Sequence, residues 1–485
     1  MFKRRAVTLA ITSLLSFGAF AVENTNNVDE SRSTLNDQQS VAVTIYNGDL
    51  ALVKDTRKVK LKTGLNVLAL RDVSAQIRPE TALLRSINTP GSLTLLEQNF
   101  DFDLLTPEKL LEKYVGKTVS LVKTNPATGA ESTEEATVLS ANNGVVLKVG
   151  NRIETGMSLA RIVYDDVPAN LRDRPTLVTQ INNKGAADQI VELSYLTGGL
   201  GWKADYVAEL NAKEDMLDLS GWVTLTNTSG TSYKNAKLQL VAGDVNRVQQ
   251  NMRPMTKMML GEMMAADAAA PMAEELLLEY HLYTLDRPTT ISENQTKQVA
   301  LLSASGVPVH KDLVLQGADY YYQGQYGEIG TKMKVGVFIE FDNKEASKLG
   351  MPLPKGILRV YKKDSSGNAQ FVGEDNIDHT PKNEKIRLKL GEAFDVTADK
   401  KQTDFKVLPN PQKGHVAYES AYELTLKNAK KEKVTVTVQE PISGDWTIVN
   451  ESAPHTKANS HLAVWKIDIP AEGKTTLIYR AQVKY

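Results

Sequence analysis

The stretch TLIYRAQVKY at residues 476–485 carries an apolar or aromatic side chain at every second position. Its apolar positions fall at every second residue: Leu477, Tyr479, Ala481, Val483 and Tyr485. Because alternate side chains of an extended chain point to the same side, this spacing predicts a β-strand with one buried face. Residues 434–438 and 462–469 show the same alternation. Strands of this kind at regular spacing predict an antiparallel sandwich over residues 366–485.

Short strands and turn residues also fill the earlier part of the chain. Two apolar runs flank the turn Asn47-Gly48-Asp49, and residues 59–68 contain a strand, a Lys62-Thr63-Gly64 turn and a second strand. Helical patterning is brief, as in the segment that begins at Pro107. The sequence therefore predicts a mainly β fold, built from several antiparallel β-sandwich or barrel domains with few short helices.

Three β domains are expected. In chain order they are an N-terminal β domain at residues 39–173, a central β domain at residues 174–365 and a C-terminal β-sandwich at residues 366–485. The N-terminal domain includes a small barrel at about residues 115–164, where Asn142-Asn143-Gly144 predicts a hairpin turn. Residues 249–279 of the central domain are rich in Met and Ala and lack strand alternation, so we expect a mobile insert there.

The first residues match a secretory signal peptide. Residues 3–5 are basic, an apolar stretch follows, and residues 19–21 form a small-x-small cleavage site. The apolar stretch is shorter than the ~20 residues of a membrane-spanning helix, which favours a cleaved signal over an anchor. We therefore expect cleavage after Ala21, a flexible polar leader at residues 22–38, and a periplasmic or otherwise exported protein that is not integral to the membrane.

The composition excludes several classes of protein. Hydrophobic residues make up 41% of the 485 residues and charged residues 24%, which is typical of a globular chain and not of a disordered or fibrous one. The formal net charge of -1 provides no basic field to attract nucleic acid. Because the chain has no cysteine, it contains no disulfide, thiolate metal site or cysteine nucleophile.

Several motifs resemble those of a known family. The stretch YLTGGLGWKADY at residues 195–206 is similar to the core signature of that family, and residues 45–53 and 72–79 resemble its opening. Further matching segments lie at residues 225–240, 353–361 and 427–430. The family is an exported bacterial domain of unknown function that is shared with mucoidy-inhibitor-like proteins. The resemblance implies an all-β fold and an exported location, and it supplies no activity or catalytic residue.

The familiar catalytic and phosphate-binding motifs are absent from the sequence. The six histidines do not form His-Glu-x-x-His, and neither a nucleophile elbow nor a Walker-type phosphate loop occurs. On a strand, Asp101 and Asp103 would share one face about 7 Å apart, a spacing that suits a glycosidase. A simpler interpretation places both carboxylates on a solvent face opposite two phenylalanines. Likewise, the glycines of residues 198–201 either bind an anion through backbone amides or form a tight bend.

A cluster of methionines is the least expected feature of the sequence. It contains seven of the twelve methionines: Met252, Met255, Met258, Met259, Met263, Met264 and Met272. Thioethers favour Cu(I), so Met255, Met258, Met259 and Met263 form a weak candidate copper site with His281 as an additional ligand. Alternatively, these adaptable side chains pack against a partner or against the protein itself.

Aromatic residues provide the candidate binding sites. Tyr320, Tyr322 and Tyr326 lie among Gln and Gly residues and could stack on sugar rings, or they could belong to an ordinary aromatic strand and turn. Trp202 follows the glycine-rich segment, which predicts that it enters the core as a structural anchor. If Trp202 were exposed, it would be a further binding candidate.

Taken together, the residues favour a non-catalytic binding or scaffolding protein of the periplasm. Its partner would be an envelope protein or a polysaccharide, and not nucleic acid, and no cofactor is expected. The alternative is a hydrolase that acts on envelope or extracellular polysaccharide, because paired carboxylates from distant segments are invisible in a sequence. A pocket with two converging carboxylates would favour the hydrolase, and a face with exposed aromatic residues would favour binding.

Overall fold

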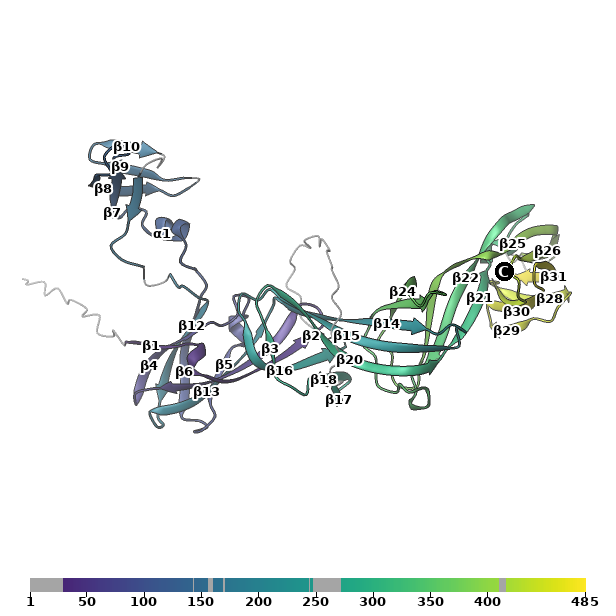
Figure 1. The fold of residues 1–485 in the computed structure, drawn as a ribbon, viewed down its shortest axis with the longest axis horizontal. Helices are drawn as coiled ribbons and strands as arrows, with labels where there is room; N and C mark the ends of the chain where they lie inside the picture. The colour runs from purple at the N-terminus through teal and green to yellow at the C-terminus, as the bar shows by residue number, and fades with distance from the viewer. Residues whose placement is uncertain are drawn as a thin grey trace, which may run out of the picture. The chain divides into compact units, whose positions relative to one another are not determined.

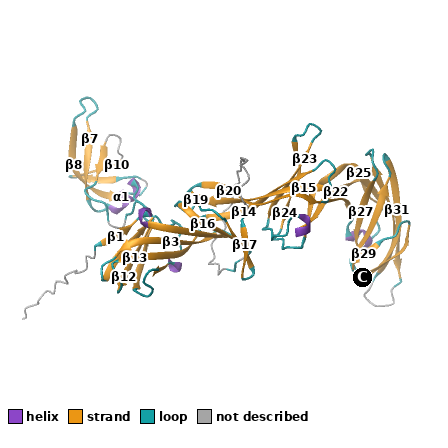
Figure 2. Ribbon diagram, turned by 60° about the horizontal axis from the view of Figure 1, so that its bottom comes forward, coloured by secondary structure: helices purple, strands orange, loops and turns teal. Residues whose placement is uncertain are grey.

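The structure, a computed structural model, describes residues 29–142, 144–155, 160–168, 171–243, 245–246, 272–409 and 416–485. Within these residues the chain forms 31 β-strands, one α-helix and four short 3-10 helices (Figure 1). Strands dominate throughout, as Figure 2 shows. The mainly β fold predicted from the sequence is therefore confirmed.

The described chain divides into two compact units. The first contains residues 29–37, 58–71 and 85–191, and the second contains residues 38–57, 72–84 and 192–485. Each unit is thus assembled from segments that are far apart in the sequence.

A four-stranded sheet in the first unit carries the pocket considered below. Its strands, in hydrogen-bonded order, are β1 (Glu30–Ser33), β4 (Gly64–Arg71), β12 (Thr176–Asn183) and β6 (Leu93–Asp101). β1 runs parallel to β4, whereas β12 is antiparallel to both of its neighbours. Alternate side chains such as Leu68, Leu70 and Leu177 are buried on this sheet, as expected for strands with one face in a core.

The first unit also contains a small five-stranded antiparallel sheet. Its strands, in order, are β10 (Arg152–Thr155), β9 (Val146–Val149), β8 (Glu131–Ser140), β7 (Thr118–Thr124) and β11 (Ala160–Val163). The helix α1 (Pro107–Lys113) precedes this sheet. Thr106 Oγ1 accepts a hydrogen bond from the amide of Lys109 at 3.2 Å, and Pro107 stands in the first turn, so the helix begins with favourable capping chemistry.

Two further sheets contain strands of the second unit. The eight-stranded sheet follows the order β17 (Ala273–Leu277), β18 (Tyr280–Thr284), β16 (Tyr233–Ala242), β2 (Gln38–Tyr46), β3 (Leu50–Lys60), β13 (Asp188–Thr197) and β5 (Leu83–Ser86), with β19 (Thr289–Ile291) beside β16. The five-stranded sheet follows the order β20 (Gln295–Pro308), β15 (Met216–Asn227), β14 (Leu200–Leu210), β23 (Gly356–Lys363) and β24 (Ala369–Ile377).

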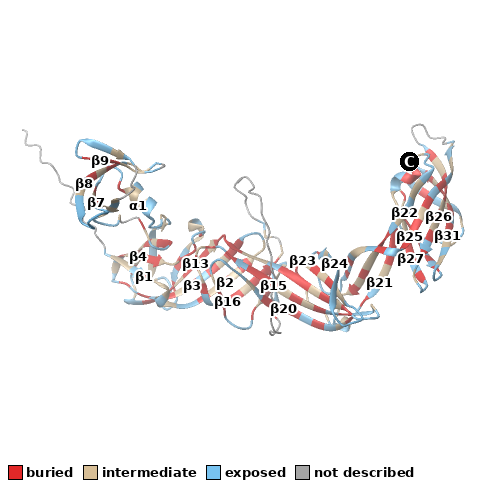
Figure 3. Ribbon diagram, turned by 45° about the horizontal axis from the view of Figure 1, so that its top comes forward, coloured by how far each residue is buried: buried red, intermediate tan, exposed pale blue. Residues whose placement is uncertain are grey.

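A nine-stranded sheet completes the second unit. Its order is β28 (Asp445–Glu451), β31 (Gly473–Lys484), β26 (Ala417–Asn428), β25 (Lys385–Leu408), β22 (Glu328–Asp342), β21 (His310–Gln316), β27 (Val434–Pro441), β30 (Leu462–Ile469) and β29 (Thr456–Asn459). Bands of buried residues alternate along these strands in Figure 3. Leu477, Tyr479, Ala481 and Val483 of β31 are buried as the alternation predicts, and they belong to one core with Trp446 and Trp465.

Two features differ from the sequence expectation. Parallel pairs occur among the mostly antiparallel strands: β1 with β4, β16 with β2, β14 with β23 and β21 with β27. In addition, residues 273–277, at the end of the expected insert, form strand β17 in a hairpin with β18. All five residues of β17 are exposed, so no apolar alternation marks this strand in the sequence. Residues 249–271 of the insert lie outside the described residues.

Candidate functional site

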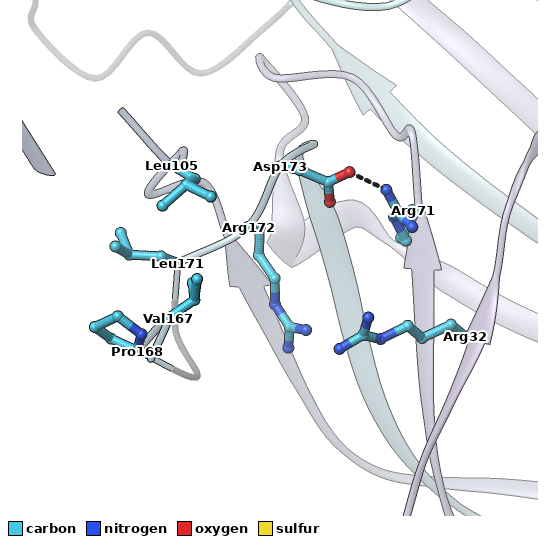
Figure 4. A pocket seen from close by; sticks show the side chains of 8 residues that line it. All are labelled: Arg32, Arg71, Leu105, Val167, Pro168, Leu171, Arg172 and Asp173. Atoms are coloured by element: carbon cyan, nitrogen blue, oxygen red, sulfur yellow. Dashed lines mark hydrogen bonds and ion pairs between the residues drawn. The ribbon is translucent and has the colours of Figure 1, made fainter. Parts of the chain in front are cut away.

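A pocket of about 250 Å³ in the first unit combines arginine side chains with an apolar wall (Figure 4). Its lining residues are Arg32, Arg71, Leu105, Val167, Pro168, Leu171, Arg172 and Asp173. We refer to it as the arginine pocket. The four apolar residues lie on one side in Figure 4, and the guanidinium groups of Arg32 and Arg172 point toward each other on the other side.

The strand register brings the three arginines together. Arg32 lies on β1, which runs parallel to β4 and places Arg32 opposite Ala69. Arg71 ends β4 and pairs with Thr176, the first residue of β12, so Arg172 and Asp173 in the segment before β12 arrive at the same end of the sheet. Charged residues at adjacent strand ends thus meet although they are about one hundred residues apart in the sequence.

Arg172 holds its place through a partly buried ion-pair network. Its Nη1 and Nη2 donate to the two carboxylate oxygens of Glu30 at 2.9 and 2.7 Å, and its Nε donates to Asp101 Oδ2 at 2.9 Å. The hydrogen bond from Arg172 lowers the pKa of the Glu30 carboxyl, and the hydrogen bond to Glu30 raises the pKa of Arg172. All three guanidinium nitrogens of Arg172 are therefore engaged within the protein.

Arg32 and Arg71, by contrast, retain donor capacity toward the pocket. Arg71 forms an ion pair with Asp173 through Nη2 only, and its Nε is buried without a hydrogen-bond partner among the described residues. Arg32 donates from Nε to Glu30 Oε1 at 3.0 Å, while its side chain is 64% exposed. Because both side chains line the pocket, an anion bound there would gain charge-assisted hydrogen bonds from their guanidinium groups.

The carboxylates Asp101 and Asp103, which the sequence offered as a glycosidase pair, are both bound to cations. Asp101 accepts from Arg172, as described above, and Asp103 Oδ2 lies 2.8 Å from Lys113 Nζ on α1. The hydrogen bond from Lys113 lowers the pKa of Asp103, which is opposite to what a general acid requires. A second pocket is lined by Glu340 and Asp342, and these carboxylates also pair with lysines, Lys385 and Lys344.

The structure separates the predicted tyrosines into exposed and buried members. Tyr320 and Tyr326 are 50% and 38% exposed, and their rings meet edge to face with centroids 5.7 Å apart. Tyr322 is fully buried, which removes it from any surface for stacking on sugars. The reason is local geometry: residues Asp319–Tyr322 form a 3-10 helix whose last two residues enter the core.

Tyr322 belongs to a buried polar cluster in the C-terminal core. Its hydroxyl donates to Glu440 Oε2 at 2.9 Å and lies 2.9 Å from the hydroxyl of Tyr479. Lys400 Nζ donates to Glu440 Oε1 at 2.6 Å and to the Tyr479 hydroxyl at 3.0 Å. Burial lowers the pKa of Lys400 and raises the pKa values of Tyr322 and Tyr479.

Trp202 lies on β14 opposite Leu225 of β15. Its side chain is only partly buried, so the expectation of a fully enclosed anchor does not fit its position on the sheet. The indole Nε1 is nevertheless buried and has no hydrogen-bond partner among the described residues. The glycine-rich segment before it forms a tight bend, since the amide of Gly199 donates to Asp49 Oδ1 at 2.8 Å and Gly199 has a φ of 75°.

Met255, Met258, Met259 and Met263, the thioethers of the copper candidate, lie outside the described residues. His281 lies on β18, where its Nδ1 and Glu274 Oε1 are 2.7 Å apart. It lines a third pocket, of about 230 Å³, together with His379 and Tyr283. Within the described part of the chain, no three His, Cys, Asp or Glu side chains are placed to hold a metal ion. The copper site stays a prediction.

The arginine pocket and the Lys400–Glu440 cluster were not singled out in the sequence. The arginines stand alone at strand ends, and no spacing rule connects them. Lys400 and Glu440 carry a signal that can be recognised afterwards. Each continues the inward alternation of its strand, after Val396 and Ala398 in β25 and after Val436 and Val438 in β27. A charged residue at an inward position points to a buried partner.

These observations define a mainly β protein with pockets at strand ends. The family model for a domain of unknown function (DUF4139) matches residues 191–485, and the chain belongs to this family. A search of curated proteins finds no match. Among the described residues, no helix combines the length and the hydropathy needed to cross a bilayer.

Proposed function

We propose that the protein is exported to the cell envelope and binds an acidic polysaccharide through the arginine pocket without catalysing a reaction on it. The export follows from the signal-peptide pattern of residues 1–21 and from the family resemblance. The observation that carries the binding role is the presence of two guanidinium groups in the pocket lining: Arg71, which is held by an ion pair with Asp173, and Arg32, whose side chain is 64% exposed.

The two sides of the pocket match the two sides of an acidic sugar. A sugar carboxylate accepts paired hydrogen bonds from guanidinium groups, which favour planar anions. The C–H face of the sugar ring packs against Leu105, Val167 and Leu171. The pocket is smaller than the ~300 Å³ at the lower end of sites for drug-sized ligands, so it suits one sugar residue of a longer chain.

Binding is favoured over hydrolysis because each candidate carboxylate is neutralised by a cation. A glycosidase needs one carboxyl that keeps its proton near neutral pH. The hydrogen bond from Lys113 acts in the opposite direction, because it lowers the pKa of Asp103. Glu340 and Asp342 each form an ion pair with a lysine. In the arginine pocket the carboxylate of the lining residue Asp173 is likewise paired, with Arg71.

Calorimetric titration with a uronate-containing oligosaccharide tests this proposal. Charged hydrogen bonds contribute roughly 1.5–3 kcal/mol, so Arg32→Gln and Arg71→Gln should each weaken binding about tenfold or more. A neutral oligosaccharide of the same length should not bind at the pocket. Arg152→Gln is the matched control, because Arg152 lies in the same unit and pairs with Glu134 and Glu154 outside the pocket.

Two results would overturn the proposal. One is equal affinity for the acidic and the neutral oligosaccharide, which would remove the role of the guanidinium groups. The other is a loss of binding in Tyr320→Ala with no change in Arg32→Gln. That result would move the site to the exposed pair Tyr320 and Tyr326 in the second unit.

A further inference from the structure

The buried cluster around Lys400 brings an amine and a carboxyl group into direct contact. The side chains of Lys400 and Glu440 are 0% and 1% exposed, and Nζ lies 2.6 Å from Oε1. Lys400 is on β25 and Glu440 is on β27, and β22 and β21 separate these strands in the sheet order. The two side chains therefore meet inside the core and not as neighbours on adjacent strands.

A closed ring of hydrogen bonds links the amine to the far oxygen of the carboxyl group. Lys400 Nζ donates to the Tyr479 hydroxyl at 3.0 Å, and the Tyr479 and Tyr322 hydroxyls are 2.9 Å apart. The Tyr322 hydroxyl then donates to Glu440 Oε2 at 2.9 Å. Protons leaving the amine thus have a continuous path to Oε2 through two tyrosines.

We propose that Lys400 and Glu440 are joined by an intramolecular amide bond between Nζ and Cδ. First, one ammonium proton passes through Tyr479 and Tyr322 to Oε2, leaving a neutral amine and a carboxylic acid. The nitrogen lone pair then attacks Cδ, and Oε1 takes the negative charge. A second amine proton follows the same path to Oε2. The Cδ–Oε2 bond breaks, water leaves, and the carbonyl at Oε1 forms again.

This condensation balances without any further reactant. Of the three protons on the ammonium group, one stays on the amide nitrogen and two leave with Oε2 as water. Nothing is oxidised or reduced, and the tyrosines end as they began. The protein alone therefore supplies every group that the bond requires.

The surroundings favour this reaction over a lasting ion pair. Since the C–O bond is about 1.23 Å long, Cδ is at most about 3.8 Å from Nζ, close to the separation of reacting atoms in near-attack geometry. Burial lowers the pKa of Lys400 and so favours its neutral, nucleophilic amine. The rings of Tyr321 and Tyr422, with centroids 4.5 and 4.9 Å from Nζ, help to enclose the site.

Gly317 adds a steric argument. A Cβ at this position would overlap the carboxyl group of Glu440, so only glycine leaves space beside the departing oxygen. The bond would close a loop from residue 400 to residue 440. Such a cross-link restricts the unfolded chain, as a disulfide does, in a protein that has no cysteine.

Mass spectrometry of the purified full-length protein tests the bond. The intact mass should be lower than the mass calculated for the chain by one water molecule, and proteolysis should release a branched peptide containing Lys400 and Glu440. The pair Lys401 and Glu423, with 3.0 Å between nitrogen and oxygen and both side chains open to solvent in part, is the internal control and should yield no branched peptide. An intact mass equal to the calculated mass, with linear peptides for both residues, would refute the proposal.

Substitutions at the reacting residues distinguish a failure to form the amide bond from a failure to fold. Lys400→Arg should have the full calculated mass, because a guanidinium group does not form this amide. Tyr322→Phe interrupts the proton path and should slow the mass loss at least tenfold while the protein folds. Glu440→Gln should release ammonia instead of water and reach the same cross-linked mass as the natural protein. A branched peptide that joins other residues, with linear peptides for Lys400 and Glu440, would also overturn the assignment.

Discussion

Trp465 Nε1 donates a hydrogen bond to Glu451 Oε2 at 2.9 Å in the core of the nine-stranded sheet. The same carboxylate oxygen lies 2.9 Å from His455 Nδ1, so one glutamate connects an indole and an imidazole. Trp202 provides the contrast, because its buried Nε1 has no acceptor among the described residues. Two tryptophans of one unit thus differ in whether their only polar side-chain atom is satisfied.

This difference predicts that replacing each tryptophan by phenylalanine lowers the free energy of unfolding by different amounts. Trp465→Phe removes a hydrogen bond to a charged acceptor and leaves space in a fully buried site, so it should lower the free energy of unfolding by about 2–4 kcal/mol. Trp202→Phe removes an unpaired buried donor from a partly exposed site and should cost less than about 1 kcal/mol. Chemical denaturation of the two variants measures both values. Equal losses would contradict the prediction.

A second matched pair lies in the bend before Trp202. Gly199 has a φ of 75°, and a Cβ there would lie 2.6 Å from the Cα of Ser229. Gly199→Ala should therefore destabilise the protein by at least about 2 kcal/mol, since left-handed strain and backbone overlap add together. A Cβ at Gly201 would meet no atom of another described residue within 4 Å, its chain neighbours aside, so Gly201→Ala should be neutral or slightly stabilising. Thermal unfolding of both variants tests this prediction. An unchanged stability of Gly199→Ala would show that the bend can shift to accept a side chain.

A third prediction concerns how much the hydroxyl group of Tyr206 contributes to stability. It donates to the carbonyl of Pro354 at 2.8 Å, and both the ring and the bond are buried. Tyr206→Phe keeps the ring but leaves this carbonyl unpaired, so the free energy of unfolding should fall by about 1–3 kcal/mol. Tyr320→Phe is the control, because that hydroxyl belongs to an exposed side chain. A change of similar size in the control would mean that the loss of any tyrosine hydroxyl lowers stability, and that the hydrogen bond to Pro354 is not what is measured.

The strands could be predicted from the sequence where one face of the strand is buried and the other is exposed to solvent. The closing strand β31 follows the alternation of Leu477, Tyr479 and Ala481, because each inward residue enters the same core. The exposed strand β17 could not be predicted in this way, because it has no buried apolar residue at alternate positions. Parallel pairs such as β21 with β27 could not be predicted either, because pairing between segments more than one hundred residues apart leaves no local pattern in the sequence.

The candidate sites were harder to predict for a related reason. The arginine pocket depends on the register that sets Arg71 against Thr176, and register between distant strands cannot be read from either strand alone. The tyrosine run showed where aromatic rings gather, but a 3-10 helix decided that Tyr320 faces solvent and Tyr322 the core. The sequence shows which residue types are present at these sites, whereas the direction in which each side chain points depends on how the chain packs.

The Glu30–Arg172 pair predicts how stability depends on pH. Its hydrogen bond lowers the pKa of Glu30 below the ordinary glutamate value of 4.5. In the folded state Glu30 therefore loses its proton more readily than in the unfolded state. Its contribution to stability is complete above the unfolded value and is lost as the pH falls through the lower, folded value.

Glu30→Gln isolates that contribution. Near pH 7 the variant should be less stable than the natural protein by roughly 1–2 kcal/mol, because a charged hydrogen-bond acceptor becomes neutral. As the pH falls through the lower, folded value, Glu30 becomes protonated in the folded natural protein as well, so the two stability curves should converge. Glu131→Gln is the control, since Glu131 and its partner Arg161 are 47% and 64% exposed and such surface pairs contribute little. Denaturation curves across this pH range test the prediction, and a difference that stays constant as the pH falls would show that Glu30 acts through packing and not through its charge.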